Sequence, residues 1–240
     1  VRQAGTALAA AAGRGDRPLR HVVQGAGGLG ALREMAPEAV DLMQSAVRTA
    51  VVQPLLRSLK TEDPVAAVAT LVSDLGVESL SFHDTQFVLE QLGIRHWESC
   101  TSAREATNMA ARKEATQQAE RVQRFGPRQT RVVAYLATTI PDAELLSGVV
   151  TPLVDAPTAV LSPVLVRHGR AGHAERAALL RVCAHLDAMP EVPAAEVFLY
   201  VCHTPCISCV TVMAQFRRRY PNVFLHVAFD DAWVTRICDT

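Results

Sequence analysis

EVFLYVCHTPCISCVTVMAQFRRRYPNVFLHVAF, residues 196–229, is the stretch that decides the fold. Glu196–Cys202 and Asn222–Phe229, at its two ends, are apolar runs rich in Val and Phe, which is typical of strands. Between them, Cys206–Arg219 is long enough for a helix of several turns. A strand, a helix and a second strand in this order predict a layered α/β domain.

The same alternation is present upstream of this stretch. Arg131–Ile140 and Pro157–Val166 are further β-rich apolar runs, although Pro163 weakens the second as a central strand because proline cannot donate a ladder hydrogen bond. Helices are expected over about Gly172–Leu186 and, with Asp230-Asp231 as its cap, through Ile237. We therefore expect residues 129–240 to form one α/β domain.

Helix signals dominate before residue 128. Pro37 begins a periodic apolar stretch that Pro54 should kink or end. Asp63-Pro64 predicts a helix start, and Gly76 can provide the left-handed C-cap of that helix. Further helices are expected over Ser81–Gly93 and Thr101–Phe125. The sequence thus predicts a Gly/Ala-rich segment over 1–36, an all-helical region over 37–128, and a domain boundary near residue 128.

Composition excludes several classes of protein. The 240 residues carry 24 Lys+Arg and 24 Asp+Glu, and this zero net charge argues against a protein held on nucleic acid by charge alone. No apolar run approaches the ~18 residues needed to span a bilayer. Six cysteines, two of them in a C-x-x-C spacing, indicate metal binding in a reducing intracellular compartment. The first 33 residues, rich in Ala, Gly and Arg, are similar to part of an organellar transit peptide, which leaves a mitochondrion or plastid open.

Four residues in the last third of the chain suit a catalytic zinc site. Such a site needs three protein ligands and one open position for water. Cys206 and Cys209 lie one turn apart at the start of a predicted helix, where free backbone N–H groups favour thiolate over thiol. His173 begins the other predicted helix, and Glu175 lies beside it, where a carboxylate can move protons without binding the metal. The alternative is a structural zinc knuckle, or a thioredoxin-like C-x-x-C with an unrelated His-Ala-Glu.

The two motif halves, Gly172-His173-Ala174-Glu175 and Thr204-Pro205-Cys206-Ile207-Ser208-Cys209, match H-x-E…P-C-x-x-C, the known signature of zinc nucleobase deaminases. Over roughly residues 130–240 the chain resembles the cytidine deaminase superfamily. The resemblance implies a zinc ion on His173, Cys206 and Cys209, Glu175 as proton shuttle, and a three-layer α-β-α fold. The chain departs from the family in two ways. Residues 131–172 contain no Asn to hold a sugar or base, and the further strand that normally follows NVFLHVAF is not evident before Thr240.

The substrate is less closely defined than the metal site. Thr204-Pro205-Cys206 is similar to the Ser/Thr-Pro-Cys of the branch that edits bases in polynucleotides, which implies that Thr204 contacts the base. His203 either faces the same pocket or caps the strand end. The expected activity is hydrolytic deamination of cytosine to uracil, in a nucleic acid rather than a free nucleoside, although adenine is left open.

Three alternatives stay open for the function. They are a free cytidine or nucleotide deaminase, a non-catalytic deaminase-like subunit of a larger assembly, and a secreted deaminase toxin. Besides binding its substrate, the chain is expected to bind a protein partner or to form a homo-oligomer. No membrane span is expected.

Overall fold

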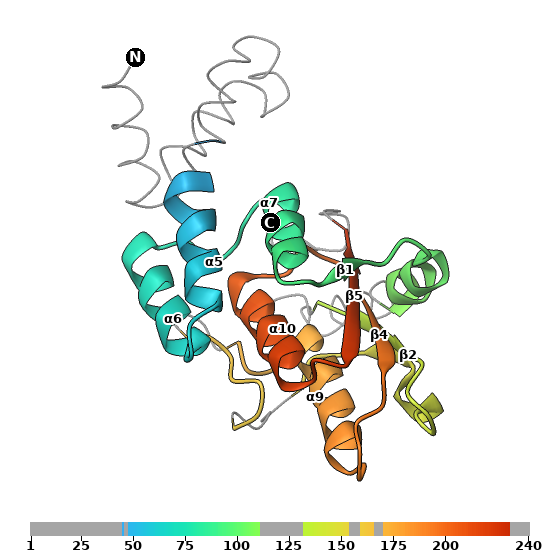
Figure 1. Cartoon of the computed structure of the whole chain (residues 1–240). Helices are drawn as coiled ribbons and strands as arrows, with labels where there is room; N and C mark the ends of the chain where they lie inside the picture. Colours follow the sequence, from blue (N-terminus) through green and yellow to red (C-terminus); the bar gives the residue numbers. More distant parts are fainter. Residues whose placement is uncertain (1–44, 46–47, 111–131, 154–158, 166–169, 231–240) are drawn as a thin grey trace, which may run out of the picture. The chain divides into compact units, whose positions relative to one another are not determined.

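A computed structural model describes residues 45, 48–110, 132–153, 159–165 and 170–230 (Figure 1). The chain divides into two compact units, Val1–Glu78 and Ser79–Thr240. The predicted segment over 1–36, the boundary near residue 128 and the final helix through Ile237 lie outside the described residues. Within the described part of the chain, no helix is both long and apolar enough to cross a membrane.

The first unit is helical where it is described. A π-helical turn, η1 (Arg48–Val52), leads directly into α5 (Gln53–Leu59), and Pro54 lies in the first turn of α5. A proline is tolerated there because the N–H groups of the first turn have no partner within the helix. The break predicted at Pro54 is therefore a change of helix type, with Leu55 and Leu59 buried beyond it.

The next helix of this unit, α6 (Pro64–Leu75), has the two ends that the sequence predicts. The side chain of Asp63 accepts a hydrogen bond from the backbone N–H of Ala66 at 3.0 Å, which is the N-cap interaction. Gly76 ends the helix in the left-handed conformation, at φ 67°.

The second unit is built on one mixed sheet. Its strands, in spatial order, are β1 (Arg95–His96), β5 (Val223–Phe229), β4 (Ala195–Val201), β2 (Ala134–Thr138) and β3 (Gly148–Val150). β1, β5 and β4 are parallel, whereas β2 is antiparallel to both β4 and β3. The predicted α/β class is confirmed, and the strands predicted over 131–140, 196–202 and 222–229 are present as β2, β4 and β5.

The region over 37–128 is not all-helical. It contains α7 (Phe82–Gln91) and a helical segment at 101–110, but β1 lies between them and pairs with the free edge of β5, with Arg95 opposite His226. A strand from upstream thus occupies the edge at which the sheet was expected to lack a strand. Two residues carry too little periodicity to be recognised as a strand in the sequence.

The strand predicted over 157–166 is also absent, because its described part, residues 159–165, contains no strand. Pro163 has no N–H for a ladder, and Leu161 adopts a positive φ of 49°, outside the extended region. The strand beside β2 is instead β3, which pairs Val149 with Tyr135.

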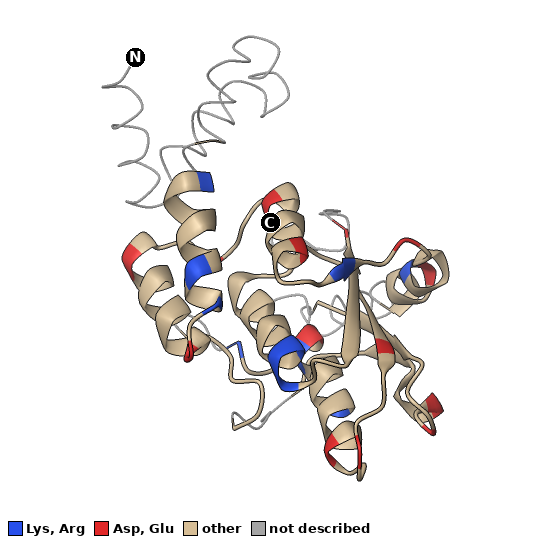
Figure 2. Ribbon diagram, in the orientation of Figure 1, with Lys and Arg blue, Asp and Glu red and all other residues tan. Residues whose placement is uncertain are grey.

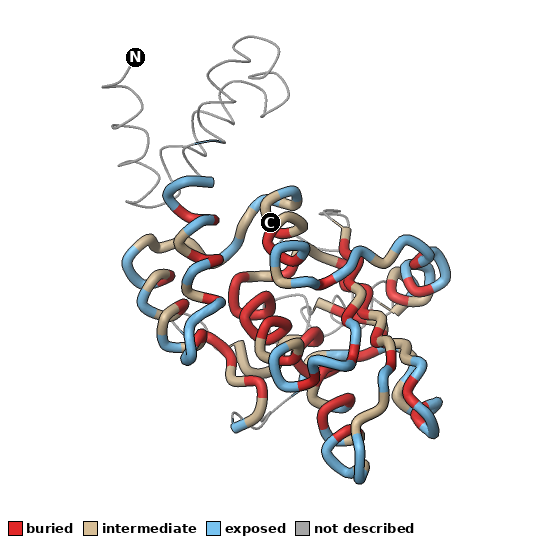
Figure 3. The backbone as a smooth tube through the Cα atoms, in the orientation of Figure 1, coloured by how far each residue is buried: buried red, intermediate tan, exposed pale blue. Residues whose placement is uncertain are grey.

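Side chains from the two faces of the sheet pack against different helices. Successive residues of a strand point to opposite faces, so Leu199 and Tyr200 of β4 lie on opposite sides. On the Leu199 side the sheet contacts α9 (Ala174–Asp187) and α10 (Ile207–Arg219), which also contact each other. On the other side Tyr200 packs against Ala103 of the 101–110 segment and against Cys100, which directly precedes that segment. Figure 3 shows that most of α10 and the central strands are buried.

Candidate metal centre

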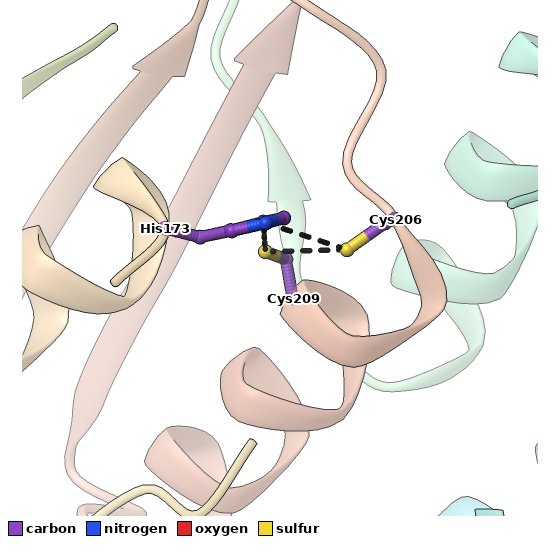
Figure 4. Close-up of side chains that lie close together, drawn as sticks. All are labelled: His173, Cys206 and Cys209. Atoms are coloured by element: carbon purple, nitrogen blue, oxygen red, sulfur yellow. Dashed lines mark hydrogen bonds between the residues drawn. The ribbon is translucent and has the colours of Figure 1, made fainter. Parts of the chain in front are cut away.

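The two helices on one side of the sheet bring the predicted ligands together at their N-terminal ends. His173 is the N-cap residue of α9, directly before its first turn. Cys206 is the N-cap residue of α10, and Cys209 lies in the first turn of the same helix. The three side chains point toward one another across the gap between the two helix ends (Figure 4). Among the described residues, this His-Cys-Cys group is the cluster that could hold a metal ion.

The distances between the ligand atoms match a tetrahedral site. His173 Nδ1 lies 3.3 Å from Cys209 Sγ and 3.7 Å from Cys206 Sγ, and the two sulfurs are 3.6 Å apart. Zinc bonds of about 2.3 Å to sulfur and 2.0–2.1 Å to nitrogen, at tetrahedral angles, place two sulfurs about 3.8 Å apart and a nitrogen about 3.6 Å from each sulfur. No ligand atom would have to move by more than a few tenths of an ångström.

Electrostatics at the site favour the charged form of one cysteine. Hydrogen bonds from Cys209 and His173 hold the pKa of Cys206 well below its usual range, despite its burial. The same interaction with Cys206, together with burial, raises the pKa of Cys209. Burial alone would lower the pKa of His173, but Cys206 and Glu175 together raise it. These interactions favour the thiolate at Cys206, the form of cysteine that binds metals.

Glu175 lies in the first turn of α9 with its side chain buried; only 3 % of the residue is exposed. Its Oε2 has no hydrogen-bond partner among the described residues, and burial raises the pKa of this carboxyl group. A buried carboxylate oxygen without a partner is costly, and a bound water molecule would remove that cost. The three ligand atoms and the unpartnered Oε2 of Glu175 together fit a metal ion with a bound water.

The remaining predicted site residues lie in the loop between β4 and α10. Thr204 and His203 are both half-buried there, and His203 Nδ1 is 3.1 Å from the carbonyl oxygen of Thr204. Their contact with a base stays a prediction. Cys202 is buried and its Sγ accepts a hydrogen bond from the N–H of Val133 at 3.3 Å, so this cysteine belongs to the core and not to the His-Cys-Cys group.

Sequence reasoning missed three polar residues that surround the ligands: Arg176, Ser208 and Gln215. Arg176 is only 1 % exposed, and its guanidinium group donates to backbone carbonyls. The position of Arg176, directly before the apolar run Ala177-Ala178-Leu179, could have indicated a buried arginine that needs hydrogen-bond acceptors. Ser208 and Gln215 gave none, because their partners lie more than 40 residues away in sequence.

The three arginines at the end of α10, Arg217–Arg219, form a basic group in Figure 2. Arg217 donates to the carbonyl of Val223, and Arg219 forms an ion pair with Asp187 at 2.9 Å. Arg217 and Arg219 thus both have partners within the protein.

Comparison of the chain with protein-family models, with curated proteins and with solved structures found no significant match. What the structure shows is a His-Cys-Cys group that could hold a metal ion, at the N-terminal ends of two helices that pack on one α/β sheet.

Proposed function

We propose that this protein is a zinc-dependent hydrolytic deaminase that converts cytosine to uracil, in a nucleic acid rather than in a free nucleoside. The observation that carries the proposal is the buried carboxylate of Glu175 beside three side chains at tetrahedral ligand distances. Three ligands leave one coordination position for water, as in catalytic zinc sites, whereas structural sites have four. This difference favours the deaminase over a zinc knuckle.

His173, Cys206 and Cys209 would hold the ion. When bound there, zinc would lower the pKa of a water molecule and so supply a nucleophile at neutral pH. Glu175 accepts the proton of that water, passes it to the ring nitrogen N3 of cytosine, and passes a second proton to the exocyclic amine as it leaves as ammonia. One water is consumed and one ammonia released, and Glu175 ends in its starting protonation state. Burial raises its pKa, which suits a group that both accepts and donates protons.

The substrate side of the proposal depends on the loop before Cys206. Thr204 is assigned to contact the base, with His203 beside it at the same loop. No Asn lies between residues 131 and 172 to bind a sugar, which supports a substrate held by its polynucleotide backbone and not by one ribose. The buried free thiols of Cys100, Cys183 and Cys202 suit the reducing intracellular compartment that we propose for the protein.

The proposal is tested on the full chain. We expect one zinc per chain by mass spectrometry, and release of ammonia with formation of uracil from single-stranded DNA or RNA that contains cytosine. Glu175→Gln should retain zinc and lower turnover by about 100-fold or more, because the proton transfers lose their carrier. The control is Glu191→Gln, which removes an exposed carboxylate after α9 and should leave turnover unchanged.

Other results would contradict the proposed function or favour one of its alternatives. Purified protein that takes up no zinc, or ammonia release that Glu175→Gln leaves unchanged, contradicts the mechanism. Faster turnover of cytidine than of an oligonucleotide would favour a nucleoside deaminase. Bound zinc without turnover of any cytosine or adenine substrate would favour a non-catalytic subunit of an assembly.

A further inference from the structure

Residues 160–164, which were predicted to belong to a strand, form an irregular segment whose backbone binds side chains of α9 and α10. We call residues 160–164 the strap. Gln215 of α10 pairs with both peptide groups of Ser162: its Oε1 accepts from the N–H at 2.9 Å, and its Nε2 donates to the carbonyl at 2.8 Å. This two-way pairing replaces the ladder that a strand would have provided.

The first residues of the strap are bound by Arg176 of α9. Its Nε donates to the carbonyl of Leu161 at 2.6 Å and its Nη2 to the carbonyl of Val160 at 2.9 Å. Its Nη1 donates to the carbonyl of Ala171 at 2.7 Å, only two residues before His173. One buried guanidinium group thus connects the strap, the approach to α9 and the first turn of α9.

The last residue of the strap contacts the other half of the metal centre. The backbone N–H of Val164 donates to the hydroxyl oxygen of Ser208 at 2.9 Å, and this bond is buried. Ser208 lies between Cys206 and Cys209 in the sequence. The strap therefore extends from the helix turn that follows His173 to the turn that carries both cysteines.

We propose that Arg176 and Gln215 are positioning residues of the metal centre, which hold the strap against both ligand-bearing helices and so fix the distance between His173 and the two cysteines. The inference rests on the metal site of the proposed function, but not on its reaction. Each of these bonds is buried or half-buried, and loss of one partner leaves a backbone group without a hydrogen bond. Such a loss moves the strap and, through Ser208, the cysteine turn.

The same two helices are also connected far from the metal centre, which provides a matched control. Tyr220, the C-cap residue of α10, donates its hydroxyl to Asp187 Oδ1 of α9 at 2.6 Å. This bond joins α9 to α10 but contacts neither the strap nor a ligand. Tyr220→Phe removes the hydroxyl alone and leaves the buried ring in place.

The test measures metal binding and geometry in the full chain, not activity. Zinc affinity is measured by chelator competition, the ligand geometry by the absorption bands of the Co²⁺-substituted protein, and stability by thermal unfolding of the metal-free protein. We expect Gln215→Leu and Arg176→Lys each to weaken zinc binding by about 10-fold or more, as is usual when a group that orients metal ligands is removed, and to shift the Co²⁺ bands. Tyr220→Phe should lower the unfolding temperature without changing either metal readout.

The proposal is overturned if Gln215→Leu and Arg176→Lys lower the unfolding temperature as Tyr220→Phe does while zinc affinity and the Co²⁺ spectrum stay unchanged. If Gln215→Leu does not fold, Gln215→Glu takes its place, because it keeps the acceptor for the N–H of Ser162 and loses the donor to its carbonyl. A wild-type chain that binds zinc with no turnover would contradict the proposed reaction and leave this inference intact. A wild-type chain that binds no metal would overturn both.

Discussion

Glu175 costs the metal-free protein stability, because its buried Oε2 has no hydrogen-bond partner among the described residues. Burial raises the pKa of this carboxyl group above the ordinary 4.5, so the unfolded chain releases the proton more readily than the native one. Stability therefore falls as the pH rises from about 4.5 through the native pKa. Such a cost is consistent with the proton-transfer role proposed for Glu175.

We predict that Glu175→Gln makes the metal-free protein more stable at pH 7, by about 1 kcal/mol or more, because the neutral amide avoids the cost of burying a charge. The gain should disappear below pH 4.5, where the wild-type carboxyl group is also neutral. Urea unfolding of both metal-free proteins at the two pH values measures it. Equal stabilities at pH 7 would show that the carboxylate has a partner in solution.

Gly172 has the tightest surroundings among the glycines next to the metal centre. Its carbonyl accepts a hydrogen bond from the N–H of Leu153 at 2.9 Å, and an added Cβ would overlap the carbonyl oxygen of Leu153. That oxygen belongs to the backbone, so it cannot turn aside as a side chain would.

We therefore predict that Gly172→Ala displaces the neighbouring His173 and weakens zinc binding, besides lowering stability by about 1–3 kcal/mol. Gly93→Ala is the control: it is strained by a φ of 71° but has open space around it and lies far from His173 in the sequence. It should lower stability without changing zinc affinity, as measured by chelator competition. Zinc affinity that stays at the wild-type level in Gly172→Ala would show that the backbone adjusts without moving His173.

Between elements, Asp187 connects the C-terminal ends of α9 and α10. It accepts a hydrogen bond from Tyr220, and both of its oxygens accept from Arg219 Nη2, at 3.1 and 2.9 Å. The Tyr220 hydrogen bond has the largest effect and lowers the pKa of Asp187 below the ordinary 3.8; burial opposes it, and the contacts with Arg219 lower the pKa further. The stabilisation is therefore present above pH 3.8 and is lost as the pH falls through the native pKa.

Asp187→Asn should cost about 0.5–1 kcal/mol at pH 7, the usual range for an exposed ion pair, and high salt should reduce the difference. The difference should shrink as the pH falls from 3.8 towards 2, because the wild-type carboxylate takes up its proton as the pH passes through its native pKa. Urea unfolding at pH 7 and at pH 2 is the measurement. A difference that persists at low pH would indicate that the Asn side chain is poorly accommodated, rather than that a charge is lost.

The helices and strands that could be predicted from the sequence are those whose ends are fixed by interactions between residues close together in the sequence. Asp63 and Gly76 mark the ends of α6 through interactions within a few residues, so the sequence alone located them. His173 and Cys206 were recognisable because each begins a helix and belongs to a short motif. The strap and β1 were not predictable. Ser162 finds its partner in Gln215 and Arg95 pairs with His226, and neither pairing leaves a pattern near those positions.

For the molecule as a whole, the predicted boundary near residue 128 can be tested against the unit that begins at Ser79. Residues 79–128 include α7, β1 and the 101–110 segment. Within this range, Cys100 and Ala103 pack against Tyr200, on the face of the sheet opposite Leu199. Arg104 of the 101–110 segment forms an ion pair at 3.0 Å with Asp230, which directly follows β5.

We predict that a fragment over 79–240 unfolds cooperatively and binds zinc, whereas a fragment over 129–240 aggregates or binds zinc poorly, because it exposes Tyr200 and the free edge of β5. Circular dichroism, size-exclusion chromatography and zinc titration of the two fragments measure this. A soluble 129–240 fragment with the same unfolding temperature would instead support the boundary near residue 128.

The central place of β5 has a consequence for the order in which the protein can fold. β5 is the last of the described strands to leave the ribosome, yet it lies between β4 and β1 and completes both parallel ladders. Until it arrives, β1 has no partner and β4 presents an open edge, the kind of surface that pairs with other chains. Contacts that join such distant parts of a chain form slowly. Until β5 emerges, the nascent protein must therefore keep both sheet edges apart from its neighbours, and a helper that covers open strand edges would raise its yield.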